Sequence, residues 1–206
     1  KGTDRDDRLG PKRATQSGLI TPEQMKNAMW LIFSLAICVG FYLAWIGGWP
    51  IIFIGLSSIA AGIAYTGGPY PLGYHGWGDM FVFLFFGLIA VPGTYYLQAG
   101  TVTPLSFWMG AVMGLLSTAI LVVNNLRDAH TDVISGKKTL AVRFGETFSK
   151  IQYALFIVIP FSLPIYLYWK LENELSLLLT LFSLPIATHL IFQIFTTAGM
   201  ELNFVL

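Results

Sequence analysis

Residues 80–126 contain no Asp, Glu, Lys or Arg and read MFVFLFFGLIAVPGTYYLQAGTVTPLSFWMGAVMGLLSTAILVVNNL. A helix needs roughly 20 apolar residues to cross the hydrocarbon core of a membrane, so this run is long enough for two spans. Three more runs without a charged side chain cover residues 27–78, 151–169 and 175–200. The chain is 55% hydrophobic and 11% charged, which lies outside the usual balance of soluble domains. The sequence therefore predicts an integral membrane protein.

Turn-forming Gly and Pro residues divide the two longest runs at residues 47–50 and 100–104. This division gives six candidate membrane helices, near residues 28–47, 51–66, 80–98, 105–124, 151–169 and 175–195. A buried helix of a large soluble protein would account for any one of them, but six in 206 residues leave too little polar surface to cover them all. The predicted fold is therefore all-α, a polytopic bundle of transmembrane helices.

Lys and Arg residues are concentrated on one predicted face of the membrane. Six precede the first helix, five lie in residues 124–150, and only Lys170 lies in the loops of the other face. Because cytoplasmic loops carry an excess of Lys and Arg, we expect both basic segments and the loop at residues 66–79 to face the cytoplasm. This predicts a multi-pass protein of the inner (plasma) membrane with its polar chemistry on the cytoplasmic side. The formal net charge of +1 gives no reason to expect a nucleic-acid partner.

The segment NNLRDAHTDVISGKK, residues 124–138, places two carboxylates at the end of an apolar helix. Positions four apart share a helix face, so Asn124, Asp128 and Asp132 form one column, with Asn125 beside it. Acids at this spacing repel each other unless a cation lies between them. Oxygen ligands without Cys or clustered His favour Mg²⁺ over Zn²⁺. The alternative is a solvated helix end that carries ordinary charges near the membrane.

A second polar set opens the chain, in residues 1–13 (KGTDRDDRLGPKR). Its carboxylates alternate with Arg and Lys, and Arg suits bidentate contacts to phosphate. Two acidic sets with basic residues between them would hold Mg²⁺ and a diphosphate. A charge run of this kind is more commonly a solvated face, and that alternative stays open.

A third polar stretch, YTGGPYPLGYHGWGD at residues 65–79, is rich in Gly and Pro. This composition predicts a structured loop and not a helix. Tyr and Trp residues here would serve as anchors at the membrane interface, whereas His75 is a candidate substrate contact.

These motifs resemble those of the UbiA superfamily of membrane-embedded aromatic prenyltransferases. Residues 124–128 (NNLRD), with Asp132 and residues 136–143 (GKKTLAVR), are similar to the second aspartate-rich motif of that family. Residues 1–27 resemble the tail of its first aspartate-rich motif. The loop at residues 74–79 (YHGWGD) is similar to the branch that acts on 1,4-dihydroxy-2-naphthoate, because relatives that act on 4-hydroxybenzoate tend to have a Tyr and Lys-Arg instead.

The resemblance spans nearly the whole chain and implies one membrane-embedded prenyltransferase domain over residues 1–206. It also implies that six of about nine family spans are present, so we expect the domain to be truncated at both ends. By family order, the Asn-Asp-x-x-Asp that opens the first motif would precede residue 1. Asp4, with its neighbour Asp7, would remain from that set.

The activity implied by the resemblance is transfer of a polyprenyl group from polyprenyl diphosphate to 1,4-dihydroxy-2-naphthoate. Loss of the ring carboxylate would give demethylmenaquinone, in menaquinone biosynthesis. Mg²⁺ would neutralise the diphosphate leaving group, aromatic side chains would stabilise the allylic cation, and the prenyl tail would lie in an apolar groove open to the lipid bilayer.

Ten residues carry this implied chemistry. Mg²⁺ would be bound by Asp128, Asp132 and Asp4, with Asn124 and Asn125 in support. The candidate substrate contacts are Arg13, Arg127, Lys138, Tyr74 and His75.

Two alternatives remain. Within the same family, a sibling enzyme would use 4-hydroxybenzoate or homogentisate as the acceptor. From a different class, a membrane transporter would place polar groups along an ion pathway at mid-depth in the membrane. The apolar runs carry only isolated Ser, Thr and Gln at that depth, which favours the enzyme.

Overall fold

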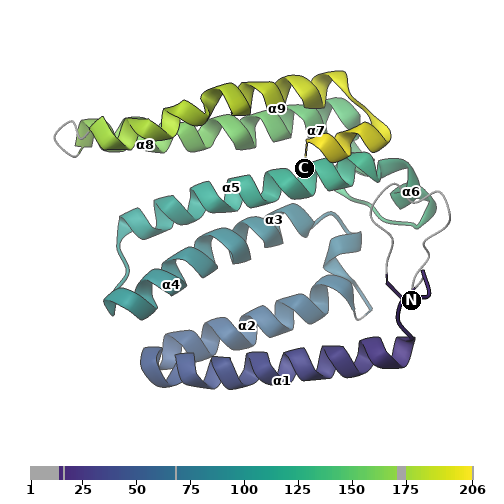
Figure 1. Ribbon diagram of the computed structural model, residues 1–206, viewed down its shortest axis with the longest axis vertical. Coiled ribbons are helices and arrows are strands. Elements are labelled where there is room, and N and C mark those ends of the chain that lie inside the picture. Colours follow the sequence, from purple (N-terminus) through teal and green to yellow (C-terminus); the bar gives the residue numbers. More distant parts are fainter. Residues whose placement is uncertain (1–13, 16, 68, 171–174, 206) are drawn as a thin grey trace.

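The computed structural model describes residues 14–15, 17–67, 69–170 and 175–205 of the chain. All regular secondary structure within these residues is helical (Figure 1). Six stretches of the described residues are long and apolar enough to cross a membrane: Pro22–Gly47, Trp49–Thr66, Gly78–Ala99, Pro104–Arg127, Leu140–Lys170 and Leu175–Thr196. Each contains one of the predicted spans, so the prediction of an all-α, polytopic membrane fold is confirmed.

A side-chain cap sets the start of α1 (Pro22–Gly47). The Thr21 hydroxyl accepts a hydrogen bond from the Gln24 backbone N–H at 3.2 Å, and the Gln24 side chain accepts one from the Thr21 N–H at 2.9 Å. Such a capping box satisfies N–H groups that have no partner inside the helix. The helix therefore begins at Pro22 and not near residue 28, where the apolar run begins.

The next two spans form a hairpin around the Gly- and Pro-rich loop. It consists of α2 (Trp49–Thr66), the 3₁₀ turn η1 (Leu72–Tyr74), α3 (Gly78–Val82), the π-helix η2 (Phe83–Ile89) and α4 (Ala90–Ala99). The structured loop predicted for residues 65–79 is confirmed for its centre, where residues 67 and 69–77 hold only the short turn η1. Residues 65–66 belong to α2 and residues 78–79 to α3.

Glycines let η2 pack its backbone directly against α5 (Pro104–Arg127). A Cβ atom added to Gly87 would lie 2.6 Å from the Gly110 carbonyl oxygen and 2.7 Å from Gly114 Cα. The two helices can approach this closely only while these positions carry no side chain.

The second half of the chain folds back on α5. Its elements are α6 (Ala129–Ile134), α7 (Leu140–Val158), η3 (Ile159–Phe161), α8 (Ser162–Lys170), η4 (Leu175–Ser183), α9 (Leu184–Thr196) and η5 (Gly199–Phe204). The fifth span begins at Leu140, so the predicted start near residue 151 and the loop predicted up to residue 150 are wrong. Gly145, with φ of 83°, kinks α7 and lets its first turn leave the line of the span.

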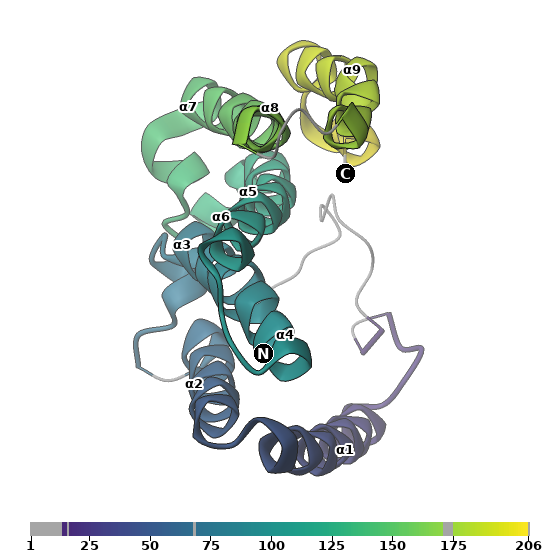
Figure 2. The ribbon, with the colours of Figure 1, turned by 90° about the vertical axis from the view of Figure 1, so that its left-hand side faces the viewer.

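The described core lies where α5 meets the C-terminal helices. Val122, Val123 and Leu126 of α5 are buried against Tyr153 of α7 and Ile194 of α9. In the end-on view of Figure 2, the spans follow one another along an open arc from α1 to α9. Apart from Gly47, no residue of α1 is buried. The arrangement brings the helix ends that carry the polar motifs to one end of the bundle.

Candidate functional site

Two loops far apart in the sequence meet at the right-hand end of the bundle in Figure 1. The Lys138 backbone N–H donates to the Tyr74 carbonyl at 2.7 Å, and Arg143 Nη2 donates to the His75 carbonyl at 2.8 Å. Gly76, with φ of 80°, permits this contact, because a Cβ there would lie 2.8 Å from the Lys138 carbonyl oxygen. The structure therefore places the α2–α3 loop against the segment that follows the Asp motif, as the shared face predicts.

The column of acids is retained, although its helix is interrupted. α5 ends at Arg127, and Asp128 has non-helical φ and ψ of −90° and 3° before α6 begins. The Asp132 N–H still donates to the Asp128 carbonyl at 2.8 Å, so the two acids keep helical spacing. α6 ends in a Schellman motif at Gly136, whose φ is 73°.

Asp128 is held by its neighbour Arg127. Arg127 Nε donates to Asp128 Oδ1 at 2.8 Å, and Nη2 donates to Oδ2 at 3.0 Å. The third nitrogen, Nη1, donates to Asn203 Oδ1 in η5 at 2.8 Å. The Arg127 side chain is only 5% exposed, against 29% for Asp128. The guanidinium thus has protein partners on all three nitrogens, where the family resemblance implies a substrate contact.

Asp132 is held by Lys137, a residue that the sequence did not single out for the site. Lys137 Nζ lies 2.6 Å from Asp132 Oδ1, and Asp132 is 5% exposed. Burial raises the pKa of the Asp132 carboxyl above its usual range, and the hydrogen bond and charge of Lys137 act against this rise. Lys137 Nζ also lies 5.6 Å from the centroid of the Tyr74 ring, which links this pair to the docked loop.

Lys138, the lysine chosen from the sequence, has an exposed side chain. Its backbone joins the two loops: its N–H binds Tyr74, and its carbonyl accepts a bond from Arg143 Nε at 3.0 Å. Gly136 turns the chain between α6 and Lys137. As a result the Lys137 side chain binds Asp132, whereas the side chain of Lys138 is exposed.

His75 is fixed within its own loop. Its Nδ1 donates to the Pro71 carbonyl at 2.9 Å, and its ring stacks on Tyr70 with centroids 3.6 Å apart. In the neutral ring, Nε2 is then a hydrogen-bond acceptor. The structure places the Tyr74 and His75 carbonyls against Lys138 and Arg143, while the substrate contact of these two residues stays a prediction.

Asn124 and Asn125 point to different partners. Asn124 Nδ2 donates to the Ile120 carbonyl at 3.1 Å, within α5. Asn125 Nδ2 donates to Asp79 Oδ1 at 3.4 Å, and Gln152 Nε2 donates to Asp79 Oδ2 at 2.8 Å. Asn125 therefore joins α5 to α3 and α7 instead of turning to the two acids that it was expected to support. Asp79 and Gln152 were missed, although Asp79 is the single charged residue between two apolar runs.

Of the predicted metal ligands, Asp128 and Asp132 lie within the described residues, while Asp4 and the substrate contact Arg13 lie outside them. The described part of the chain holds no group of three or more His, Cys, Asp or Glu residues that would bind a metal ion alone. Mg²⁺ is commonly held by one or two carboxylates together with water and substrate phosphate oxygens. Two carboxylates at helical spacing fit that requirement.

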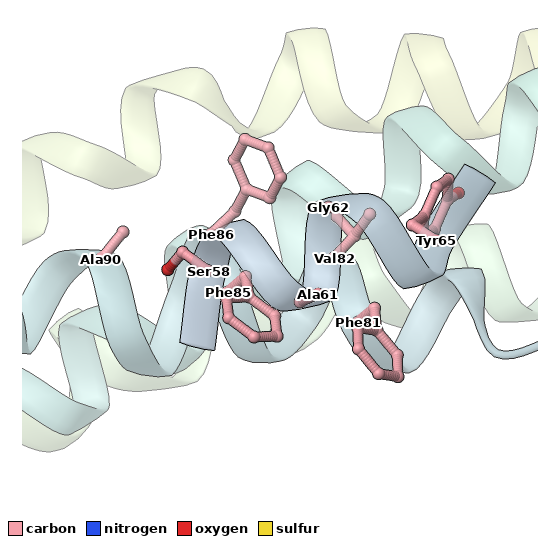
Figure 3. Close-up of a pocket in the computed structure, with 9 residues that line it drawn as sticks. All are labelled: Ser58, Ala61, Gly62, Tyr65, Phe81, Val82, Phe85, Phe86 and Ala90. Atoms are coloured by element: carbon pink, nitrogen blue, oxygen red, sulfur yellow. The ribbon is translucent and has the colours of Figure 1, made fainter. Parts of the chain in front are cut away.

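An apolar cavity of about 520 Å³ lies between α2 and the third span. Its lining residues are Ser58, Ala61, Gly62, Tyr65, Phe81, Val82, Phe85, Phe86 and Ala90. Figure 3 shows Tyr65 at one end of this group and Ala90 at the other. Four of the nine lining residues are aromatic, and Tyr65 lies at the end of α2 that leads into the docked loop.

The sequence profile of the UbiA prenyltransferase family matches residues 2–201. The chain belongs to the UbiA prenyltransferase family. This confirms the resemblance, and with six apolar helices it makes the chain a polytopic membrane protein. No solved structure matches this UbiA-family chain.

Several curated relatives carry one name, 1,4-dihydroxy-2-naphthoate octaprenyltransferase. The Escherichia coli K12 protein is 40% identical over an alignment of 164 positions, which covers 77% of this chain and 53% of the relative. The Mycobacterium tuberculosis protein is 42% identical over 153 residues, 74% of this chain and 52% of the relative. The Haemophilus influenzae protein is 34% identical over an alignment of 212 positions, which covers 98% of this chain and 68% of the relative. The UbiA-family chain thus spans about half the length of the first two relatives.

Proposed function

We propose that the protein transfers a polyprenyl group from polyprenyl diphosphate to 1,4-dihydroxy-2-naphthoate, with loss of CO₂, giving the hydroquinone form of demethylmenaquinone. The observation that carries the proposal is the docking of the His75 loop on the segment that follows Asp128 and Asp132, through the 2.7 Å bond between Lys138 and Tyr74. This contact brings a candidate acceptor site to a candidate diphosphate site. Membership of the UbiA family supports the reaction class, and the names of the relatives support the acceptor.

The diphosphate end of the donor would lie at the acids. Asp128 and Asp132, with Asp4, are the residues proposed to hold Mg²⁺. When bound, Mg²⁺ would offset the charge of the diphosphate and make it a better leaving group. Lys138 and Arg13 would contact the diphosphate oxygens, as Lys and Arg commonly do.

The acceptor would lie against the loop at residues 70–77. His75 Nε2, oriented by the bond from Nδ1 to Pro71, would accept a hydrogen bond from a naphthoate hydroxyl and increase the electron density of the ring. The ring carbon that carries the carboxylate then bonds to the allylic carbon as the C–O bond to the diphosphate breaks. The carboxylate leaves as CO₂, and the electron pair of its C–C bond restores the aromatic ring.

The prenyl tail would occupy apolar surroundings, for which the cavity lined by Phe81, Phe85 and Phe86 is the candidate among the described residues. Aromatic faces stabilise a developing allylic cation. An apolar site also excludes water, which would convert that cation to an alcohol. We further propose that this end of the bundle faces the cytoplasm, in the inner membrane.

A product assay with an acceptor panel tests the proposal. Full-length protein in membrane vesicles is given Mg²⁺, a polyprenyl diphosphate, and 1,4-dihydroxy-2-naphthoate, 4-hydroxybenzoate or homogentisate. We expect a prenylated product only with the naphthoate, with Asp128→Ala and a Mg²⁺-free sample as inactive controls. Turnover with another acceptor alone would contradict the substrate but keep the reaction class. No Mg²⁺-dependent product with any acceptor would contradict both.

A further inference from the structure

At the proposed metal site, all three guanidinium nitrogens of Arg127 donate hydrogen bonds to protein side chains. Its guanidinium grips both carboxylate oxygens of Asp128 and uses its remaining nitrogen on Asn203 of η5. We infer that Arg127 is a positioning residue that orients the Asp128 carboxylate for Mg²⁺, and that Asn203 fixes Arg127 in turn. The inference rests on the proposed function and assigns the C-terminal η5 a part in that site.

The orientation of Asp128 needs such a partner. Asp128 lies between α5 and α6 with non-helical dihedral angles, and its side chain is partly exposed, so neither helix packing nor burial fixes its rotamer. Two parallel N–H···O bonds from a planar guanidinium fix both carboxylate oxygens at once. Each oxygen has two lone pairs, so one on each stays available to a metal ion.

The guanidinium is itself held from the side of η5. Nη1 of Arg127 binds Asn203 Oδ1 at 2.8 Å, and the residues flanking Asn203 in the same segment, Leu202 and Val205, are buried in the core beside α5. Packing therefore anchors η5 independently of the Asn203 side chain. Asn203 therefore fixes the position of the Arg127 guanidinium, and the guanidinium in turn fixes the Asp128 carboxylate.

The same geometry argues against a direct contact between Arg127 and the diphosphate. A phosphate would have to replace Asp128 or Asn203 on a side chain that is only 5% exposed. Such a replacement would break existing charge-assisted bonds of the buried Arg127 guanidinium, which is costly. The exposed Lys138 carries no such cost.

Three variants of the full-length protein separate these roles. Arg127→Lys keeps the positive charge but loses the bidentate bond to Asp128, and Arg127→Gln loses both. Asn203→Ala keeps the charge and the bidentate bond but removes the side-chain oxygen that accepts from Arg127 Nη1. Lys170→Gln, at the opposite end of the bundle, is the neutral control. Each is measured for binding of Mn²⁺ alone by electron paramagnetic resonance, for kcat and donor KM, and for apparent Tm.

We expect Arg127→Lys and Arg127→Gln to lose about 10- to 100-fold in Mn²⁺ affinity and kcat, the usual effect of removing a residue that supports a metal ligand. Asn203→Ala should show a smaller loss in the same direction, and donor KM should change less than about threefold because Arg127 does not touch the donor.

Full rescue by Arg127→Lys would overturn the inference, because charge alone would then suffice. A raised donor KM with unchanged Mn²⁺ affinity would also overturn it and would restore the diphosphate contact. A third result would give Arg127 only a structural role: a lower Tm, with activity lost only in proportion to the unfolded fraction and normal Mn²⁺ affinity of the folded fraction. If wild-type protein shows no prenyl transfer, the proposed function fails separately, whatever the Mn²⁺ titrations give.

Discussion

At the scale of single residues, each proposed metal ligand within the described chain has its own basic partner. Arg127 holds Asp128 with two bonds, and Lys137 holds Asp132 with one. The two partners differ in kind, because Arg127 is buried and bidentate whereas Lys137 is a point charge with 30% of its side chain exposed. Lys137 therefore acts chiefly by favouring the ionised form of the Asp132 carboxyl. We expect this effect to show in the pH dependence of activity.

We predict that Lys137→Met moves the acidic limb of the kcat/KM profile to higher pH. Burial already raises the pKa of Asp132, and Lys137 lowers it in part, so removing the ammonium raises the pKa further. Below this pKa the carboxyl is protonated and cannot bind a metal ion. The profile of the variant should thus lose activity at a pH where the wild-type protein still works.

Lys138→Met is the matched control, because Lys138 is not among the causes of the Asp132 shift. It should weaken donor binding and leave the acidic limb in place. An unmoved limb in Lys137→Met would show that Asp132 does not govern activity in acid.

At the scale of elements, the contact between η2 and α5 leaves no room for a side chain at Gly87, Gly110 or Gly114. We predict that Gly87→Ala destabilises the protein by about 1–3 kcal/mol, the usual cost of overpacking. The added Cβ would lie 2.6 Å from a carbonyl oxygen of α5, so the helices must separate. Unfolding in mixed detergent micelles measures the effect.

Gly55→Ala in α2 is the control for the helix propensity of Ala, because a Cβ there meets nothing within 4 Å. It should be neutral or stabilising by up to about 1 kcal/mol. Equal effects of the two substitutions would contradict the close packing of η2 on α5.

The end of α9 depends on a lysine from α7. Lys150 Nζ lies 3.4 Å from the Phe195 carbonyl and 3.5 Å from the Thr197 carbonyl, and it pairs with Glu146 at 2.7 Å. The carbonyls end a helix and need donors, whereas Glu146 is exposed and such a pair contributes about 0–1 kcal/mol.

We predict that Lys150→Met lowers the free energy of unfolding by about 1–3 kcal/mol, more than Glu146→Gln does. The reason is that Lys150→Met removes the donor from two carbonyls, whereas Glu146→Gln removes only an exposed ion pair. The same detergent titration compares the two variants. A larger effect of Glu146→Gln would show that the ion pair is the stabilising contact.

At the scale of the whole molecule, the six spans were predictable because runs without charge are long enough for helices and little else. The early start of the fifth span was not, because Arg143, Glu146 and Lys150 interrupt the apolar pattern. Their charges are accommodated by tertiary partners: Arg143 binds the His75 loop, and Lys150 binds Glu146 and the end of α9. Hydropathy carries no signal of such partners.

In the candidate site, too, local features were predictable from the sequence and contacts between distant residues were not. The spacing of Asp128 and Asp132 predicted their shared face, since helix geometry is local. The choice of Lys137 over Lys138 depends on the turn at Gly136, and the meeting of Asp79 with Gln152 depends on the packing of both α3 and α7 against α5. Contacts of this kind join distant parts of the chain and leave no periodic trace in the sequence.

The proposed orientation in the membrane is testable with single cysteines in a Cys38→Ser background. His130→Cys lies on α6 beside the acids, and Thr101→Cys lies in the loop between α4 and α5, and both positions are exposed. The excess of Lys and Arg beside His130 predicts a cytoplasmic location. An impermeant maleimide should therefore label Thr101→Cys in intact spheroplasts and His130→Cys only after permeabilisation; the reverse pattern would contradict the orientation.

The most direct test of the proposed reaction follows the fate of the acceptor carboxylate. Full-length protein in membranes is given Mg²⁺, a polyprenyl diphosphate and 1,4-dihydroxy-2-naphthoate that carries a carbon label in the carboxyl group. We predict one labelled CO₂ for each prenylated product, and neither from Asp132→Asn nor without Mg²⁺. A prenylated product that keeps the label, or one that forms equally well without Mg²⁺, would contradict the proposal.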